Sequence, residues 1–259
     1  MGTVMQDFRV IPLGVGNAFS ARYYTTCMAV GSENSWILID CPHPIRKILA
    51  EGSSAAGLDL DVNAIEFLAL SHLHADHASG LEDYGFYHHY VLGRRARVLS
   101  SPRVSGKMWQ GLLSAGMEES RETPDSSPVR RKLNDFFEVV PLDETRPVCC
   151  GSFTVECRLT QHSIPTSAFR ITCERTGRKL GYSGDTVFDP TLIDWLSSCH
   201  LILHEVTTID DSNVHTCYKY LAALPAELRS RMRLYHYPDD FDLDGSAIEP
   251  LRQGRVYVI

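Results

Sequence analysis

The chain has 259 residues, with 25 Lys and Arg against 32 Asp and Glu, which gives a formal net charge of −7. This acidic balance argues against stable binding of long nucleic acids through bulk charge, and a hydrophobic fraction of 44% argues against a disordered chain. The sequence shows no secretory leader, and no run of about 18 apolar residues that would span a membrane. We therefore expect a single cytoplasmic domain over residues 1–259 that does not act on membranes.

Short apolar runs separated by Gly-, Asp- or His-rich breaks predict strands along the whole chain. The clearest predicted strands are Phe8–Leu13, Ser35–Asp40, Ile65–Ser71, Arg97–Ser100, Phe153–Thr160, Phe169–Cys173, Lys179–Ser183, Leu201–Glu205, Arg233–Tyr237 and Arg255–Ile259. The predicted helices are Pro44–Glu51, Pro102–Ala115, Pro190–Ser197 and Thr216–Leu224. Because the strands come in runs with helices interspersed, the pattern indicates an α+β fold and not a strict alternation of strand and helix.

Residues 82–132 are interpreted as an insertion or lid-like segment. Its last part, 118–132, is polar and rich in Pro and Ser, which predicts a mobile loop. Strand-like runs resume soon after this loop, so it does not mark a domain boundary.

The beginning of that segment, DYGFYHHY, is rich in aromatic residues and His. Tyr84, Tyr87, His88 and His89 are candidate substrate contacts, because a nucleotide pocket needs a stacking surface and a few polar groups. A loop that reaches a partner subunit is a second interpretation. An amphipathic helix that buries its aromatic side chains is the third, and we favour it.

The densest group of metal-binding residue types is SHLHADH, at residues 71–77, directly after a predicted strand. His72, His74, Asp76 and His77 form a compact set of nitrogen and oxygen donors. Such a set suits Zn²⁺, and Mn²⁺ or Fe in related sites. The sequence therefore predicts a metal site at the end of this strand.

An HxHxDH string after a strand resembles the signature of the metallo-β-lactamase superfamily, whose members form an αβ/βα four-layer sandwich with a metal site at one edge. Further residues match that superfamily in the expected order along the chain. They are Asp40 in WILIDCP, His162 in LTQHSIP, Asp185 in GYSGDT and His236 in RLYHYPDD. The resemblance thus covers the chain from Arg9 to Ile259.

The resemblance implies a centre of two divalent metal ions. The implied ligands are His72, His74 and His162 for one metal, and Asp76, His77 and His236 for the second, with Asp185 bridging the two. Two cations about 3.5–4 Å apart share a hydroxide at neutral pH and stabilise charge on the attacking and leaving oxygens. Asp40 is expected to accept a hydrogen bond from a ligand imidazole and so to fix its tautomer.

Two further strings resemble the ribonuclease Z branch of the superfamily. LILHEVT, at residues 201–207, is similar to that branch's His-Glu-Ala-Thr motif, and His204 lies in this strand beside Glu205. His215-Thr216 is similar to its second-shell His-Ser/Thr motif. The resemblance implies that Glu205 and His215 form a pair in which His215 donates a proton to the leaving oxygen, while Asp76 helps to deprotonate the attacking water.

The sequence departs from ribonuclease Z in one respect. In that family a long tRNA-binding arm lies between the third ligand motif and the bridging Asp. Here the interval from His162 to Asp185 has room for only two strands and a turn. The catalytic residues are therefore expected without the surface that grips a long polyanion.

Several ribonuclease Z-like proteins without the arm hydrolyse cyclic mononucleotides, phage proteins among them. The resemblance thus implies a dinuclear metal-dependent phosphodiesterase that acts on small phosphodiesters, above all 3′,5′-cyclic mononucleotides. Three alternatives stay open: a tRNA 3′-processing endonuclease, a hydrolase of a cyclic phosphoribosyl diester, lactone or thioester, and a sensor with structural metals. A homodimer is expected from family habit.

Overall fold

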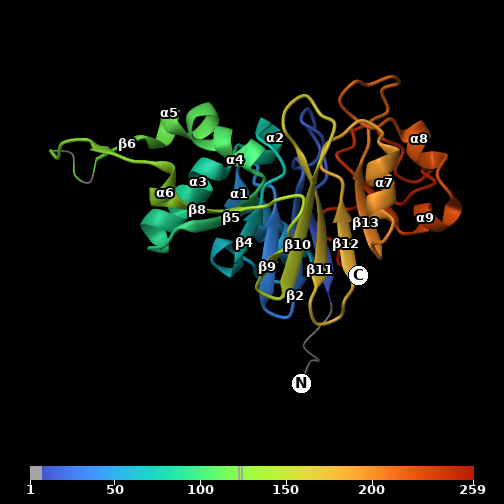
Figure 1. Cartoon of the computed structure of the whole chain (residues 1–259), viewed down its shortest axis with the longest axis horizontal. Coiled ribbons are helices and arrows are strands. Elements are labelled where there is room, and N and C mark those ends of the chain that lie inside the picture. Colours follow the sequence, from blue (N-terminus) through green and yellow to red (C-terminus); the bar gives the residue numbers. More distant parts are fainter. Residues whose placement is uncertain (1–7, 122, 124) are drawn as a thin grey trace.

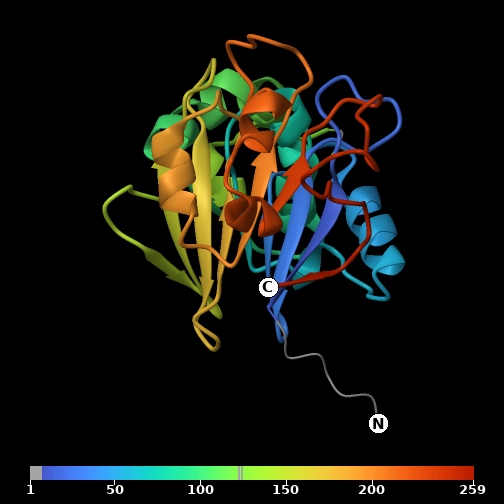
Figure 2. The same cartoon turned by 90° about the vertical axis from the view of Figure 1, so that its right-hand side faces the viewer.

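Two β-sheets pack face to face, and helices cover the outer surface of each sheet (Figure 1). The computed structural model describes residues 8–121, 123 and 125–259. Helices from the first half of the chain lie against the first sheet. The helices α7 (Pro190–Leu196), α8 (Tyr218–Ala222) and α9 (Ala226–Ser230) lie against the second. Figure 2, which faces these later helices, shows them in orange over the second sheet. The described chain therefore has the four layers, helices–sheet–sheet–helices, that the resemblance to the metallo-β-lactamase superfamily implies.

The first sheet is antiparallel at one edge and parallel from β3 onwards. In spatial order its strands are β15 (Tyr257–Val258), β1 (Arg9–Gly14), β2 (Cys27–Ser32), β3 (Ser35–Ile39), β4 (Phe67–Ala69), β5 (Ala96–Ser100) and β8 (Phe137–Pro141).

The second sheet also combines antiparallel pairs with a parallel part, β12–β13–β14. Its strands in order are β14 (Met232–Tyr235), β13 (Leu201–Glu205), β12 (Lys179–Tyr182), β11 (Ser167–Cys173), β10 (Phe153–Leu159) and β9 (Val148–Cys150). A separate hairpin consists of β6 (Glu119–Ser120) and β7 (Val129–Arg130), and it projects from the body (Figure 1).

The helices are short, and two of the longer helical stretches contain a π-helical turn. The α-helices are α1 (Ile45–Ala55), α2 (Ala75–Ala78), α3 (Leu81–Phe86), α4 (Pro102–Met108), α5 (Ser114–Met117), α6 (Leu133–Phe136), α7 (Pro190–Leu196), α8 (Tyr218–Ala222) and α9 (Ala226–Ser230). A 3₁₀ turn η1 (Val62–Ala64) and π turns η2 (Tyr87–Val91) and η3 (Trp109–Leu113) complete them. Within the described residues, no helix combines the length and the apolar character that crossing a bilayer requires.

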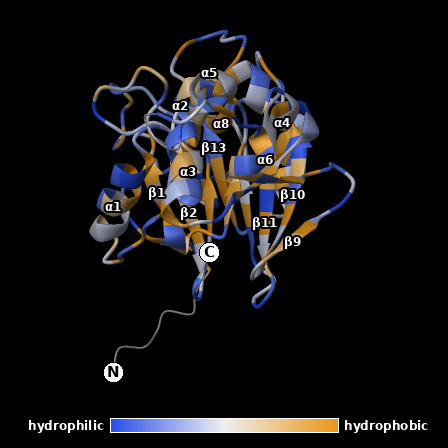
Figure 3. Ribbon diagram, turned by 90° about the vertical axis from the view of Figure 1, so that its left-hand side faces the viewer, coloured by the Kyte–Doolittle hydropathy of each residue, from blue (hydrophilic) through white to orange (hydrophobic). Residues whose placement is uncertain are grey.

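Apolar side chains form two core layers, and hydrophobic colour concentrates on the strands in Figure 3. One layer lies between the sheets, where Phe153 and Phe169 are fully buried. The other lies between the first sheet and α1, whose buried residues Ile48 and Leu49 face the strands. Burial of apolar surface stabilises both layers by roughly 25 cal/mol per Å².

The α+β fold class is confirmed, and each of the ten predicted strands overlaps a strand of the structure. β2, β6, β7, β8 and β9 were not among the predicted strands. The interpretation of 82–132 as an insertion is wrong for its central part, because β5 lies between β4 and β8 within the first sheet. The mobility of loop 118–132 stays a prediction, and residues 122 and 124 of that loop lie outside the described residues.

The parallel strands of both sheets end at the same edge of the molecule. Asp40 follows β3, the SHLHADH string follows β4, Asp185 follows β12, Glu205 ends β13 and His236 follows β14. Ligands of open α/β sheets bind outside the carboxyl ends of parallel strands, where side chains from several strands can meet. The fold therefore gathers the predicted site residues at one edge.

Candidate metal centre and active site

Three imidazoles converge into one group of nitrogen donors. The distance from Nδ1 of His74 to Nε2 of His72 is 3.1 Å, and the distance from the same atom to Nε2 of His162 is also 3.1 Å. The donor atoms of this group lie within 4.8 Å of one another, which suits a single ion. His72 and His74 come from the end of β4, and His162 comes from the loop between β10 and β11.

A second group lies beside the first and mixes carboxylates with imidazoles. Nε2 of His236 is 3.2 Å from Oδ2 of Asp76 and 3.3 Å from Oδ2 of Asp185. Nε2 of His77 is 3.4 Å and 3.5 Å from the same two oxygens. Oδ2 of Asp185 is also 3.9 Å from Nε2 of His72, so Asp185 lies between the two groups. The structure thus brings together all seven predicted ligands, in the two predicted sets.

Hydrogen bonds to the far ring nitrogens turn the ligand nitrogens toward the site. Nδ1 of His162 lies 2.8 Å from the carbonyl oxygen of Val214, to which only a protonated Nδ1 can donate. Nδ1 of His72 lies 2.9 Å from Oγ of Ser71. In both rings the other nitrogen, Nε2, then keeps its lone pair, which is the form that binds a metal.

Asp40 accepts several of the hydrogen bonds that hold the site in place. Its Oδ2 accepts hydrogen bonds at 2.8 Å from Nδ1 of His77, at 2.8 Å from the hydroxyl of Tyr182 and at 2.9 Å from Oγ of Ser71. The carboxylate is fully buried. The backbone of Asp40 has φ +61° and that of His236 has φ +59°, a left-handed conformation that costs free energy for residues other than Gly. Strained backbone at two residues of one site is typical of functional positions.

The chemistry of the donor set fits divalent cations. Burial lowers the pKa of His72 well below its ordinary value and lowers the pKa of His74 and His162, so these rings are neutral at neutral pH. Burial opposes ionisation of Asp185, but the neighbouring His236 and His77 hold the pKa of its carboxyl well below the usual range. Within the described residues, the buried atoms His77 Nε2 and Asp185 Oδ1 have no hydrogen-bond partner. A cation bound between them would satisfy both atoms.

Glu205 and His215 form a pair at the edge of the second group. Nδ1 of His215 is 3.1 Å from Oε1 of Glu205, which also accepts hydrogen bonds from the backbone N–H groups of Thr186 and Thr216. Burial opposes protonation of His215, but the hydrogen bond and the charge of Glu205 outweigh it and raise the pKa of the imidazole. With Nδ1 held by Glu205, the opposite nitrogen of His215 is the one left for a substrate.

His204 takes no direct part in the cluster of ligand atoms. Its side chain is fully buried, and Nδ1 lies 2.8 Å from the carbonyl oxygen of Glu205. This contact supports the backbone that carries Glu205.

The aromatic stretch after the metal string is mainly structural. Tyr84 and His88 are buried in the core beneath α3, and Nδ1 of His88 lies 2.9 Å from the carbonyl oxygen of Tyr84. Neither has surface for a substrate, so the prediction that they are substrate contacts is wrong. His89 lies with its Nδ1 3.1 Å from the carbonyl oxygen of Asp135. The favoured helix is confirmed, since the stretch forms α3 and η2.

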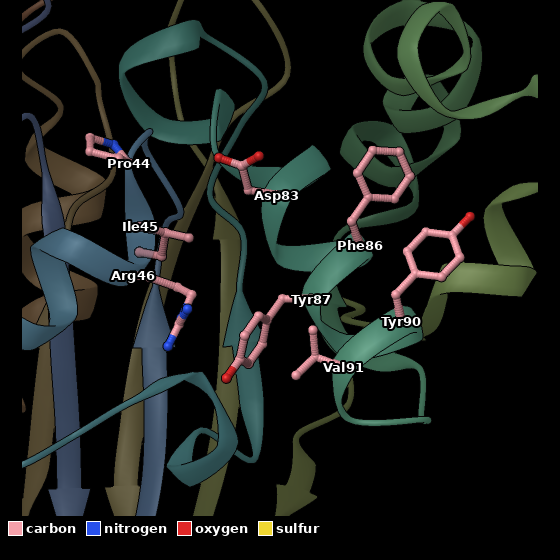
Figure 4. A pocket seen from close by; sticks show the side chains of 8 residues that line it. All are labelled: Pro44, Ile45, Arg46, Asp83, Phe86, Tyr87, Tyr90 and Val91. Atoms are coloured by element: carbon pink, nitrogen blue, oxygen red, sulfur yellow. The ribbon is translucent and has the colours of Figure 1, made fainter. Parts of the chain in front are cut away.

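Tyr87 borders a surface cavity of about 360 Å³ that contains none of the predicted ligands. Figure 4 shows Arg46 and Ile45 on one wall of this cavity, facing Tyr87 and Val91 on the other. The guanidinium of Arg46 lies 4.3 Å from the centre of the Tyr87 ring. The prediction that Tyr87 contacts a substrate at the metal site therefore has no support in this geometry.

Two supporting residues were missed by the sequence analysis. Ser71 precedes the first His of the metal string and connects it to Asp40, and Tyr182 donates to Asp40 from β12. Ser71 lies within the SHLHADH string, so its position beside the first His was a usable signal. Tyr182 is distant from Asp40 in sequence, and only the packing of the two sheets brings them together.

Solved structures share the fold at low sequence identity. The metallo-β-lactamase fold protein YhfI from Bacillus subtilis has a TM-score of 0.74 and 16% identity, with 98% of this chain and 100% of that chain covered. The short form of human tRNase Z has a TM-score of 0.67 and 20% identity, with 96% and 98% covered. The expected metallo-β-lactamase fold is thus confirmed.

Sequence comparison identifies the family within this fold. The family described as Anti-Pycsar protein Apyc1 matches residues 8–256. An Anti-Pycsar protein Apyc1 from Saccharibacillus brassicae is 31% identical over 259 residues, which cover 95% of this chain and 98% of the relative. The two proteins are therefore similar from end to end and not in the metal string alone. This chain belongs to the Anti-Pycsar protein Apyc1 family.

Proposed function

We propose that this chain is a dinuclear metal-dependent phosphodiesterase that hydrolyses 3′,5′-cyclic mononucleotides. The observation that carries the proposal is the Glu205–His215 pair, which lies beside two groups of metal-binding atoms at one sheet edge. The relatives carry the name Anti-Pycsar protein. We extend the anti-Pycsar activity that this name states to this chain.

Each of the two donor groups is proposed to hold one divalent ion. The first would be bound by His72, His74 and His162, the second by Asp76, His77 and His236, and Asp185 would bridge them. Zn²⁺ is the proposed ion, with Mn²⁺ or Fe as alternatives, because imidazole and carboxylate donors suit all three. Divalent cations at such a site supply nucleophilic water near neutral pH and neutralise charge on a phosphodiester.

The chain itself supplies the proton transfers. The carboxylate of Asp76 accepts a proton from the attacking water, whose oxygen forms a new bond to phosphorus. The opposite P–O bond breaks, and His215 donates a proton to the departing ribose oxygen. Glu205 keeps His215 oriented and protonated through Nδ1, at 3.1 Å. A positioned acid or base of this kind contributes about 10²–10⁴-fold in rate.

The segment between His162 and Asp185 supports a small substrate. It contains only β11, a turn and β12, so no arm for a tRNA projects from this place. The net charge of −7 likewise disfavours a long polyanion. We further propose that the chain is a single hydrolase domain that acts in the cytoplasm as a homodimer. A monomer in light scattering would contradict the proposed homodimer.

A substrate panel tests the proposal. Metal-replete protein should convert cyclic mononucleotides to linear mononucleotides and should cleave bis(p-nitrophenyl) phosphate more slowly. A tRNA precursor and a lactone serve as controls for the other substrate classes. Turnover of the tRNA precursor alone, or of the lactone alone, would contradict the cyclic-nucleotide activity.

A further inference from the structure

A slot with apolar walls and a cationic rim lies directly beside the first metal-binding group. One cavity, of about 290 Å³, is lined by His162 itself and by the loop that follows it. A second, of about 190 Å³, lies between that loop and α4. Both are lined by Arg103, Ile164 and Pro165, so they are neighbours and share a wall. Oγ of Ser163, which lines the first cavity, is 3.4 Å from Nε2 of His74, so this cavity reaches the His74 ring at the nitrogen that does not belong to the ligand group.

The residues that line the second cavity are apolar on its walls and cationic at its rim, which suits a flat ring with polar edges. Leu73, Val104, Ile164 and Pro165 supply apolar walls on two sides of the second cavity. Figure 1 shows that the two sides come from separate parts of the fold, α4 and the loop between β10 and β11. Pockets for small ligands are mostly apolar with a few polar groups that fix orientation.

Two cationic side chains lie at the rim of this slot. Arg103 and Lys107 are one turn apart on α4, so their side chains emerge on the same face. Within the described part of the chain, neither side chain has an ion-pair partner within 4.0 Å. Asp143 and Glu144 share a further cavity with Arg103, and Glu144 accepts a hydrogen bond from the backbone of Leu159. The guanidinium is therefore free to meet a ligand.

We propose that this slot binds the nucleobase of the substrate, with Arg103 as the residue that positions it. A guanidinium can stack on a base or donate two parallel hydrogen bonds to the acceptors at its edge. With the phosphodiester at the metal-binding atoms, the base lies between Ile164–Pro165 and α4. This inference rests on the proposed function, and it adds which part of the chain would bind the base of the cyclic mononucleotide.

Two glycines of the same helical stretch give a matched pair of variants. Gly111 lines the slot, and a Cβ there would meet only Cβ of Lys107, at 3.6 Å. Gly106 is exposed on α4, lines none of these cavities, and a Cβ there meets nothing within 4 Å. Leu at either position is therefore compatible with the backbone, but only Leu at position 111 fills the slot.

The test compares Gly111→Leu, Gly106→Leu and Arg103→Ala on two substrates. One is a cyclic mononucleotide, and the other is the same ribose 3′,5′-cyclic phosphate with a methyl group in place of the base. Gly111→Leu and Arg103→Ala should raise KM for the cyclic mononucleotide by about tenfold or more and leave KM for the base-free substrate unchanged. Gly106→Leu should change neither value. If Gly111→Leu changed KM equally for both substrates, or changed neither KM, the proposal that this slot binds the base would be wrong.

Direct binding separates this inference from the proposed function. The dissociation constant of the linear mononucleotide, measured by calorimetry on the same folded variants, should rise for Gly111→Leu and Arg103→Ala and stay constant for Gly106→Leu. If the unaltered protein hydrolyses neither substrate, the proposed function fails, and these constants still decide whether the slot binds the base. Dissociation constants that are equal in all variants would contradict base binding in the slot, even if the enzyme is active.

Discussion

His215→Ala is expected to lower kcat for a cyclic mononucleotide by about 10²–10⁴-fold, the range for loss of a positioned proton donor. The leaving ribose oxygen would then depart without a proton, because Glu205 lies behind the imidazole and is fully buried. Metal content should stay at the level of the unaltered protein, since neither of the two proposed ligand sets includes His215.

His43→Ala is the matched control. His43 is exposed, pairs with Asp83 and belongs to neither of the two proposed ligand sets, so its loss should leave kcat unchanged. Metal content and the midpoint of unfolding are measured for both variants. An unchanged rate in His215→Ala, or a loss of metal from it, would show that His215 is not the proton donor.

Asp185→Ala is expected to remove bound metal and to lower kcat/KM by at least about a thousandfold, which corresponds to about 4 kcal/mol in the barrier. Asp185 contributes the oxygen that lies 3.3 Å from Nε2 of His236 and 3.5 Å from Nε2 of His77. Without it, two cations at this edge would lose the carboxylate that lies between the two donor groups and offsets their mutual repulsion. Asp194→Ala, at an exposed position of α7, is the control and should retain both metal and activity. Full metal content in Asp185→Ala would contradict the bridging position.

Much of the site could be predicted because its signals are local strings attached to strand ends. The HxHxDH string lies directly after β4, and the order of the later strings fixes which strand each one ends. The pairing of Glu205 with His215 could be inferred only through the resemblance, since nine residues separate them in the sequence. Their contact depends on how that loop returns to the end of β13.

The aromatic stretch shows where the sequence left alternatives open. Tyr84 and His88 are four residues apart, so on a helix they share one face, and this face is buried against the first sheet. Tyr87 lies on another face and borders the surface cavity. Composition suggested a stacking surface, but helical periodicity alone cannot say which face the core covers.

The segment 82–132 was misjudged for a different reason. β5 is only five residues long, and its neighbours β4 and β8 are distant in sequence. A short strand between helices looks the same in the sequence whether it belongs to the main sheet or to an insertion. Only the parallel pairing of β5 with both neighbours shows that it belongs to the first sheet.

A metal titration tests the central claim most directly. Protein freed of metal with a chelator is supplied with increasing amounts of Zn²⁺, or of Mn²⁺, and hydrolysis of a cyclic mononucleotide is followed at each addition. The rate should rise from near zero and level off at about two equivalents per chain, as two donor groups require. Hydrolysis that persists in the metal-free protein, or that is absent at every metal loading, would contradict a dinuclear cyclic-nucleotide phosphodiesterase.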